Sequence, residues 1–200
     1  MKLITTTIII LAASSHLAFS QGLLDQPGWR YTIHGDKGDV AFTDLHFDET
    51  DKVAGTGCLT YDAKGQTGSE LWVCVRNDKL QEPVDLNSQQ AVAFSYKLTA
   101  RELTDRVGKF MTSLPMGLVV GNDSPDATVS FEASLLADGE WHEVTAPIEE
   151  FINPNKENPG TWDKTDATAI SVRQYLWSCE TVDFTLKIAD LRFIPAASKK

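Results

Sequence analysis

Apolar and polar residues alternate most regularly near the C-terminus, over Ala169–Trp177 and again over Phe184–Phe193. A period of two is typical of a β-strand that buries one face and exposes the other. In the first stretch one face is aliphatic and the other carries an arginine and two aromatic rings: Ile170, Val172 and Leu176 alternate with Arg173, Tyr175 and Trp177. We expect a strand here, with the Arg/Tyr/Trp row pointing away from the core.

Short stretches of similar pattern recur along the chain, separated by turn-forming residues. The further predicted strands are Val40–Phe47, Gly57–Asp62, Glu70–Arg76, Ala91–Leu98, Met116–Val120, Thr128–Leu135 and Trp141–Ile148. Only Thr99–Ser113 breaks the pattern, because Leu103, Val107, Phe110 and Met111 recur at helical spacing and predict a short helical insertion near residues 100–113. The pattern therefore indicates one all-β domain, a β-sandwich or jelly roll.

The three cysteines, Cys58, Cys74 and Cys179, suggest one disulfide and one free thiol if the chain is exported. The predicted strands Gly57–Asp62 and Glu70–Arg76 flank a glycine-rich connection and read as a hairpin, which would bring Cys58 opposite Cys74. We expect a Cys58–Cys74 disulfide, with Cys74–Cys179 as the alternative.

Residues 1–20 fit a secretory signal peptide: one lysine, an apolar run over Ile8–Ala13, and small residues before Gln21. The run is too short to span a bilayer, and no second hydrophobic stretch follows. We expect a secreted, extracellular protein whose single mature domain covers residues 21–200, and we expect it to be a monomer.

The chain has a formal net charge of −10, and its basic residues are scattered singly. A nucleic-acid-binding surface needs clustered Lys and Arg. Neither nucleic acid nor an anionic membrane is therefore an expected partner.

The row Arg173, Tyr175 and Trp177 would form a flat platform if it is exposed. Aromatic faces suit the apolar C–H face of a pyranose, while arginine donates hydrogen bonds to hydroxyls. The alternative is that a neighbouring loop or strand covers the row. An exposed row predicts a surface that binds sugars.

Several segments together resemble carbohydrate-binding modules of the galactose-binding-like jelly-roll type. They are GEWHEVTAPIEEF with Gly139, Trp141, Pro147 and Phe151, the strand AISVRQYLW, and FTLKIADLRF with Asp190 and Phe193. The likeness extends more weakly upstream to about Val40. It implies a sugar-binding sheet face, and the positions that match are Arg173, Tyr175 and Trp177 together with the outward residues of the predicted hairpin, Glu70, Trp72 and Arg76.

The same resemblance implies a structural Ca²⁺ ion between an early acidic turn and the last strand. Asp190 would be one ligand, and Asp48, Glu49 or Asp51 would complete the shell, since calcium prefers carboxylate oxygens. The alternative for Asp190 is an ion pair with Arg192 or Arg30.

We predict a non-catalytic protein that binds a polysaccharide of the β-glucan type. Two alternatives remain open. The first is a jelly-roll polysaccharide lyase or glycoside hydrolase, for which Tyr175, Arg173 and Arg76 would imitate a lyase site. The second is a secreted domain whose aromatic row docks another protein.

Overall fold

The computed structural model describes residues 23–53, 55–121, 128–153 and 166–197, which form a β-sandwich. The strands are β1 (Arg30–His34), β2 (Ala41–Phe42), β3 (His46–Val53), β4 (Thr56–Gln66), β5 (Trp72–Asn77), β6 (Val84–Asp85), β7 (Gln89–Asp105), β8 (Ser113–Gly121), β9 (Val129–Leu136), β10 (Asp138–Pro147), β11 (Asp166–Ala167), β12 (Ala169–Tyr175) and β13 (Cys179–Pro195). The helical segments are single 3₁₀ turns: η1 (Leu23–Asp25), η2 (Leu86–Ser88), η4 (Ile148–Glu150) and η5 (Leu176–Ser178).

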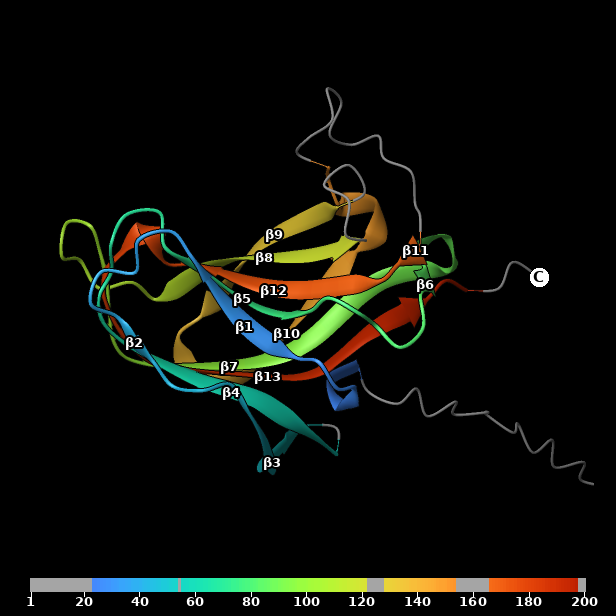
Figure 1. Cartoon of the computed structure of the whole chain (residues 1–200), viewed down its shortest axis with the longest axis horizontal. Helices are drawn as coiled ribbons and strands as arrows, with labels where there is room; N and C mark the ends of the chain where they lie inside the picture. Colours follow the sequence, from blue (N-terminus) through green and yellow to red (C-terminus); the bar gives the residue numbers. More distant parts are fainter. Residues whose placement is uncertain (1–22, 54, 122–127, 154–165, 198–200) are drawn as a thin grey trace, which may run out of the picture.

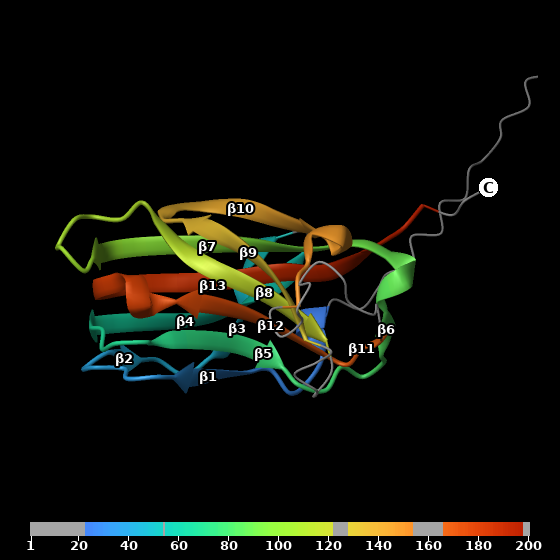
Figure 2. The same ribbon diagram turned by 90° about the horizontal axis from the view of Figure 1, so that it is seen from above.

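Two antiparallel sheets face each other (Figures 1 and 2). Sheet A has the order β1-β5-β12-β8-β9, and sheet B has the order β10-β7-β13-β4-β2, with β3 also paired to β4. The inward side chains of both sheets form one core that includes Tyr61, Phe94, Phe184 and Leu118. The all-β sandwich expected from the sequence is confirmed.

The helical insertion predicted near residues 100–113 is wrong. β7 continues to Asp105, turns, and returns through an isolated bridge between Thr104 and Phe110. Leu103 is buried in the core, whereas Val107 and Phe110 at the turn are 86% and 56% exposed. The spacing that suggested a helix combines one core position with an exposed turn.

The hairpin predicted from Gly57 to Arg76 is also wrong, because its two strands belong to different sheets. β4 pairs with β13 in sheet B, and β5 pairs with β1 and β12 in sheet A. Cys58 and Cys74 alternate with core residues of their own strands, so their side chains point away from the core on opposite sides of the sandwich. The expected Cys58–Cys74 disulfide does not form, and Cys179 is a free thiol as well.

Among the described residues, no helix is both long and apolar enough to cross a membrane. The predicted signal peptide, residues 1–20, lies outside the described residues.

Candidate functional site

The outward side of sheet A gathers most of the residues that the sequence singled out. We call this surface face A. Strand register places its residues in rows across β1, β5, β12, β8 and β9: Thr32, Cys74, Arg173, Gly117 and Glu132 form one row, and His34, Trp72 and Tyr175 form the next. Residues that the sequence placed on two separate elements, Trp72 and Arg76 on one and Arg173 and Tyr175 on the other, thus share one surface.

Trp72 lies between two neighbours that come from the strands on either side of β5. The imidazole of His34 on β1 stacks on its ring, with centroids 3.9 Å apart and an interplanar angle of 11°. The guanidinium of Arg173 on β12 lies over the ring, 5.0 Å from its centroid. These contacts order the Trp72 ring, and they leave Trp177 as the more open aromatic surface.

Trp177 is 45% exposed and stacks on Tyr175, with ring centroids 4.4 Å apart. The strand predicted over Ala169–Trp177 ends at Tyr175, and Trp177 belongs to the turn η5. Ending the strand there lets the indole lie against the Tyr175 ring, which an extended strand would not do, because residues i and i+2 stand about 7 Å apart. Tyr175 and Trp177 therefore lie together as predicted, but their rings are stacked rather than side by side along a strand.

The phenol of Tyr175 is fixed from the neighbouring strands. Its hydroxyl donates a hydrogen bond of 2.9 Å to Oε1 of Glu132 on β9. Between them lies Gly117 on β8, where any Cβ would collide with that hydroxyl. Burial, followed by the hydrogen bond to Glu132 and its charge, raises the pKa of Tyr175. A phenol held protonated in this way is poorly suited to act as the base of a lyase.

Arg106, which sequence reasoning missed, secures the turn that carries Trp177. Its guanidinium donates to the carbonyl of Trp177 (3.0 Å), to that of Thr67 (3.1 Å) and to that of Gly68. It thus ties η5 to the segment that precedes β5. No sequence motif could have revealed this, because the acceptors are backbone atoms.

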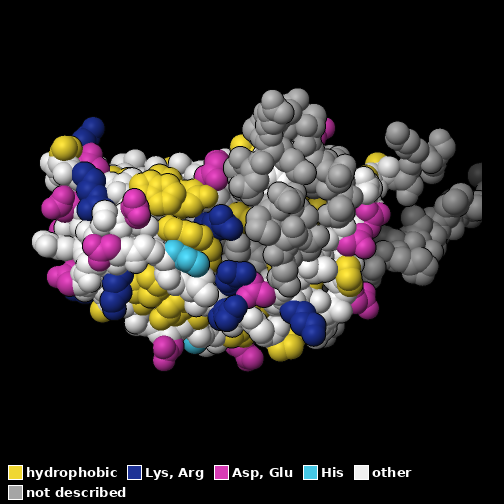
Figure 3. Space-filling model, turned by 45° about the horizontal axis from the view of Figure 1, so that its top comes forward, with side chains coloured by type: hydrophobic (Ala, Val, Ile, Leu, Met, Phe, Trp, Pro, Cys, Tyr) yellow, Lys and Arg dark blue, Asp and Glu magenta, His cyan; other side chains and the backbone are white. Residues whose placement is uncertain are grey.

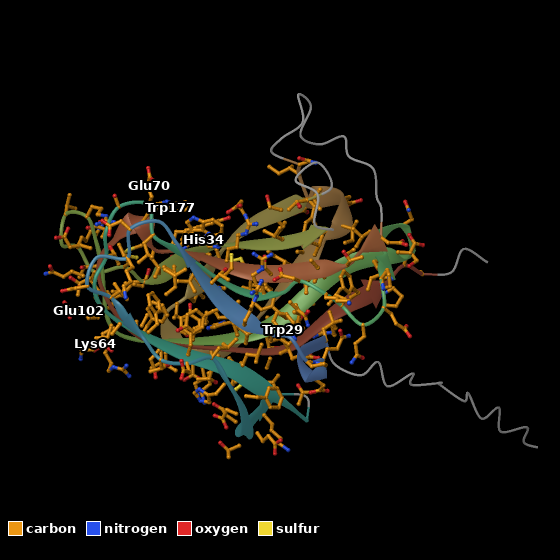
Figure 4. The ribbon with its side chains drawn as sticks, in the orientation of Figure 1. Trp29, His34, Lys64, Glu70, Glu102 and Trp177 are labelled. Carbon is orange, nitrogen blue, oxygen red and sulfur yellow. The ribbon has the colours of Figure 1, made fainter. Side chains whose placement is uncertain are left out.

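Glu70 and Arg76 are placed differently from the other predicted sugar-binding residues. Glu70 lies in the turn before β5 with a φ of 58°, so it is not part of the strand, and it is exposed. Figure 4 shows Glu70 and Trp177 at the same end of the sandwich. Arg76 is on β5, but its guanidinium is paired with Asp78, which also pairs with Arg30.

The residues expected to hold calcium already have cations of the chain as partners. Asp48 and Asp51 both accept hydrogen bonds of 3.0 Å from Lys187 Nζ. Asp190 pairs with Arg192, as the alternative expected. Among the described residues, which include Glu49, no group of three or more His, Cys, Asp or Glu side chains could hold a metal ion. These carboxylates therefore do not fit a calcium ion as they stand, and calcium binding stays an untested prediction.

The described residues of face A form a surface on which Trp177 is partly open to solvent. In Figure 3 hydrophobic side chains lie on either side of a histidine, with basic side chains beside them. A separate cavity of about 390 Å³ lies elsewhere, between η1 and the β3–β4 region, with Trp29 and Phe47 in its lining. Small molecules usually bind in enclosed pockets. An open aromatic surface is better suited to a long ligand whose ends extend beyond the protein.

Comparison with solved structures places this fold among known ones. The family 11 carbohydrate-binding module of a cellulosomal cellulase from Clostridium thermocellum superimposes with a TM-score of 0.56 at 10% identity, covering 90% of this chain and 95% of the module. The fold is that of carbohydrate-binding modules.

Two further structures agree. A family 11 module from the same organism, in complex with a β-1,3-1,4-mixed-linked tetrasaccharide, gives a TM-score of 0.54 at 10% identity, covering 87% of this chain and 92% of that one. A family 28 module described as specific for non-crystalline cellulose gives 0.50 at 14% identity, covering 88% and 90%. No protein-family model matches the sequence, and the search of curated proteins found no significant match. At a sequence identity of 10–14%, similarity to these structures shows a shared fold, and the same fold can serve different functions.

Proposed function

We propose that this protein binds a polysaccharide on face A without transforming it. The observation that carries the proposal is the exposed Trp177 ring, stacked on Tyr175 and held by backbone contacts of Arg106. An indole that is open on one side and fixed on the other offers an apolar plane to a pyranose at little cost in side-chain entropy. The sandwich fold shared with carbohydrate-binding modules supports the same reading.

The ligand class we propose is a β-glucan or a closely related β-linked glycan. Its support is indirect: two of the structural neighbours are described with a mixed-linked β-glucan oligosaccharide and with non-crystalline cellulose. We also propose that the protein is secreted after removal of residues 1–20 and acts as a monomer outside the cell. For an open site of this size we expect a Kd between micromolar and millimolar, about −8 to −4 kcal/mol.

Affinity electrophoresis of the mature protein through gels containing single polysaccharides tests the proposal. We expect retardation by a soluble β-glucan, and no unsaturated or reducing-end product in the same mixtures. The variant Trp177→Ala should lose at least a factor of ten in affinity while nearly keeping its melting temperature, because its side chain is not part of the buried core.

Phe47→Ala is the matched control, since Phe47 is 40% exposed on β3, away from face A. It should bind like the wild type. Product formation would favour the lyase or hydrolase alternative. Absence of retardation by any glycan would favour the protein-docking alternative.

A further inference from the structure

Arg173 stands out among the arginines because its guanidinium has no oxygen acceptor in the part of the chain that the structure describes. The other five described arginines are all engaged: Arg30 and Arg76 with Asp78, Arg101 with Asp183, Arg192 with Asp190 and Glu143, and Arg106 with three carbonyls. In Arg173 the Nε atom is buried with no hydrogen-bond partner at all. No carboxylate within the described ranges forms an ion pair with this cation, although the chain contains 28 acidic residues in all.

The position of Arg173 is nevertheless well defined. It lies on the central strand of sheet A, β12, with Cys74 opposite on β5 and Gly117 opposite on β8. Its guanidinium lies over the indole of Trp72. The planar group is thus oriented before any ligand arrives, which lowers the entropy lost when it forms hydrogen bonds.

The charges around Arg173 favour an anion. Arg30 and Arg76 share the single carboxylate Asp78, so this pair keeps one net positive charge. Glu132, in the same row as Arg173, keeps its negative charge, because its hydrogen-bond donor Tyr175 is neutral. The three arginines and the two carboxylates, Asp78 and Glu132, still leave one net positive charge. Basic side chains are visible on this side of the molecule in Figure 3, although the whole chain is acidic.

We propose that Arg173 binds the carboxylate of an acidic sugar unit, so that the preferred ligand is a β-linked glycan that contains uronic acid. The inference rests on the proposed function, because it assigns a ligand group to the same face. A carboxylate meets a guanidinium with two parallel hydrogen bonds, stronger than those made by neutral hydroxyls. The sugar ring next to it would lie along the aromatic surface of Tyr175 and Trp177.

Two oligosaccharides with the same backbone test this. Cellohexaose is neutral, and its C6-oxidised form, a β-1,4-linked oligoglucuronate, differs only in carrying carboxylates. Isothermal titration of the mature protein should give about tenfold tighter binding of the oxidised form. The Arg173→Gln variant should lose this preference and bind the two oligosaccharides about equally.

Arg101→Gln is the matched control, because it also removes one arginine charge, but on sheet B. It should keep the preference, and thermal melting of each variant verifies that it is folded. Equal or weaker binding of the oxidised form by the wild type, or a preference that survives in Arg173→Gln, overturns the inference but leaves the proposed function standing. Failure of both sugars to bind overturns the inference, and it overturns the proposed function as well if none of the polysaccharides in the gels retards the protein.

Discussion

The hydroxyl of Tyr175 occupies the space that a Cβ atom at Gly117 would fill. The two residues are on neighbouring strands, and the missing side chain of Gly117 is what allows Tyr175 to lie over β8 and reach Glu132. Glycine is usually unfavourable inside a strand, and one use of it is to let another group approach closely.

Gly117→Ala should therefore displace the Tyr175 ring and break its hydrogen bond to Glu132. We expect glycan affinity to fall about fivefold, the effect of losing roughly one hydrogen bond of 1 kcal/mol. The check is a double-mutant cycle with Tyr175→Phe, measured by titration with one oligosaccharide. Once Tyr175→Phe has removed the hydroxyl, the added alanine should cost much less, because only the milder contacts with the ring carbon Cζ (3.1 Å) and Glu132 (3.2 Å) remain. A full additional loss in the double variant would contradict the explanation.

Arg106→Gln should lower both stability and binding. Three carbonyls on two segments lose their donor, so we expect the free energy of unfolding to fall by about 1–2 kcal/mol, discounted for the exposure of the side chain. Trp177 should become more mobile, which fluorescence anisotropy of the indole and a weaker Kd would report. Arg101→Gln should show neither change, because Arg101 is itself exposed and its partner Asp183 keeps the ion pair with Lys64.

His34 predicts a pH dependence of stability. Burial first, and then the charges of Arg76 and Arg173, lower its pKa below the ordinary 6.5. The unfolded chain therefore binds the proton more readily, and the free energy of unfolding falls as the pH drops below 6.5. Melting temperatures of the wild type and His34→Gln between pH 7.5 and about 5 should converge, since the variant lacks this titration. Parallel curves would show that His34 does not contribute.

Asp48 and Asp51 change stability at a lower pH than His34 does, so they cannot produce the same pH dependence. Hydrogen bonds from Thr50, and then Lys187, hold the pKa of Asp48 below its usual value, and Lys187 does the same for Asp51. Their contribution to stability is therefore lost only as the pH falls through about 4 and below. A variant that removes the Lys187 charge should be less stable at neutral pH and should lose less further stability on acidification, because this stabilisation is present above the ordinary aspartate pKa and lost below it.

The cysteines should behave as three buried thiols. Burial raises the pKa of Cys58, Cys74 and Cys179, which makes each less reactive as well as less accessible. We expect a thiol reagent to label none of them in the folded protein and all three in denaturant, and dithiothreitol to leave the melting temperature unchanged. A mass two units below the reduced value, or a lower melting temperature on reduction, would show a disulfide.

The alternation of apolar and polar residues predicted which side chains of β12 point away from the core, and the structure confirms this prediction. Val172 is buried, whereas Arg173 and Tyr175 are outward, as expected. Alternation says nothing about which strand lies alongside, because the partner is chosen by packing over the whole chain. For this reason the sequence pattern wrongly predicted that Cys58 and Cys74 lie opposite each other in a hairpin, whereas they lie in different sheets.

A bulge explains why the strand β7 was predicted to end at Leu98 although it continues to Asp105. Phe184 pairs with Ala100 but Asp183 pairs with Glu102, so β7 carries an extra residue there. Leu98 and Leu103 then face the same core, although an odd number of positions separates them. The bulge interrupts the period of two, so the sequence pattern does not show that the strand continues, whereas the register with β13 does.

The strand order of sheet A also bears on how the protein folds. β1, β5 and β12 are neighbours in space, yet the chain must build most of the domain before β12 can close between β5 and β8. Such non-local pairing slows folding, because distant segments must meet before contacts compensate for the lost chain entropy. We expect the site that joins His34 and Trp72 to Tyr175 to form only once β12 has paired with β5, so ligand binding would report that β12 is in place. A chain truncated before residue 169 should lack Arg173, Tyr175 and Trp177 and should not bind the ligand.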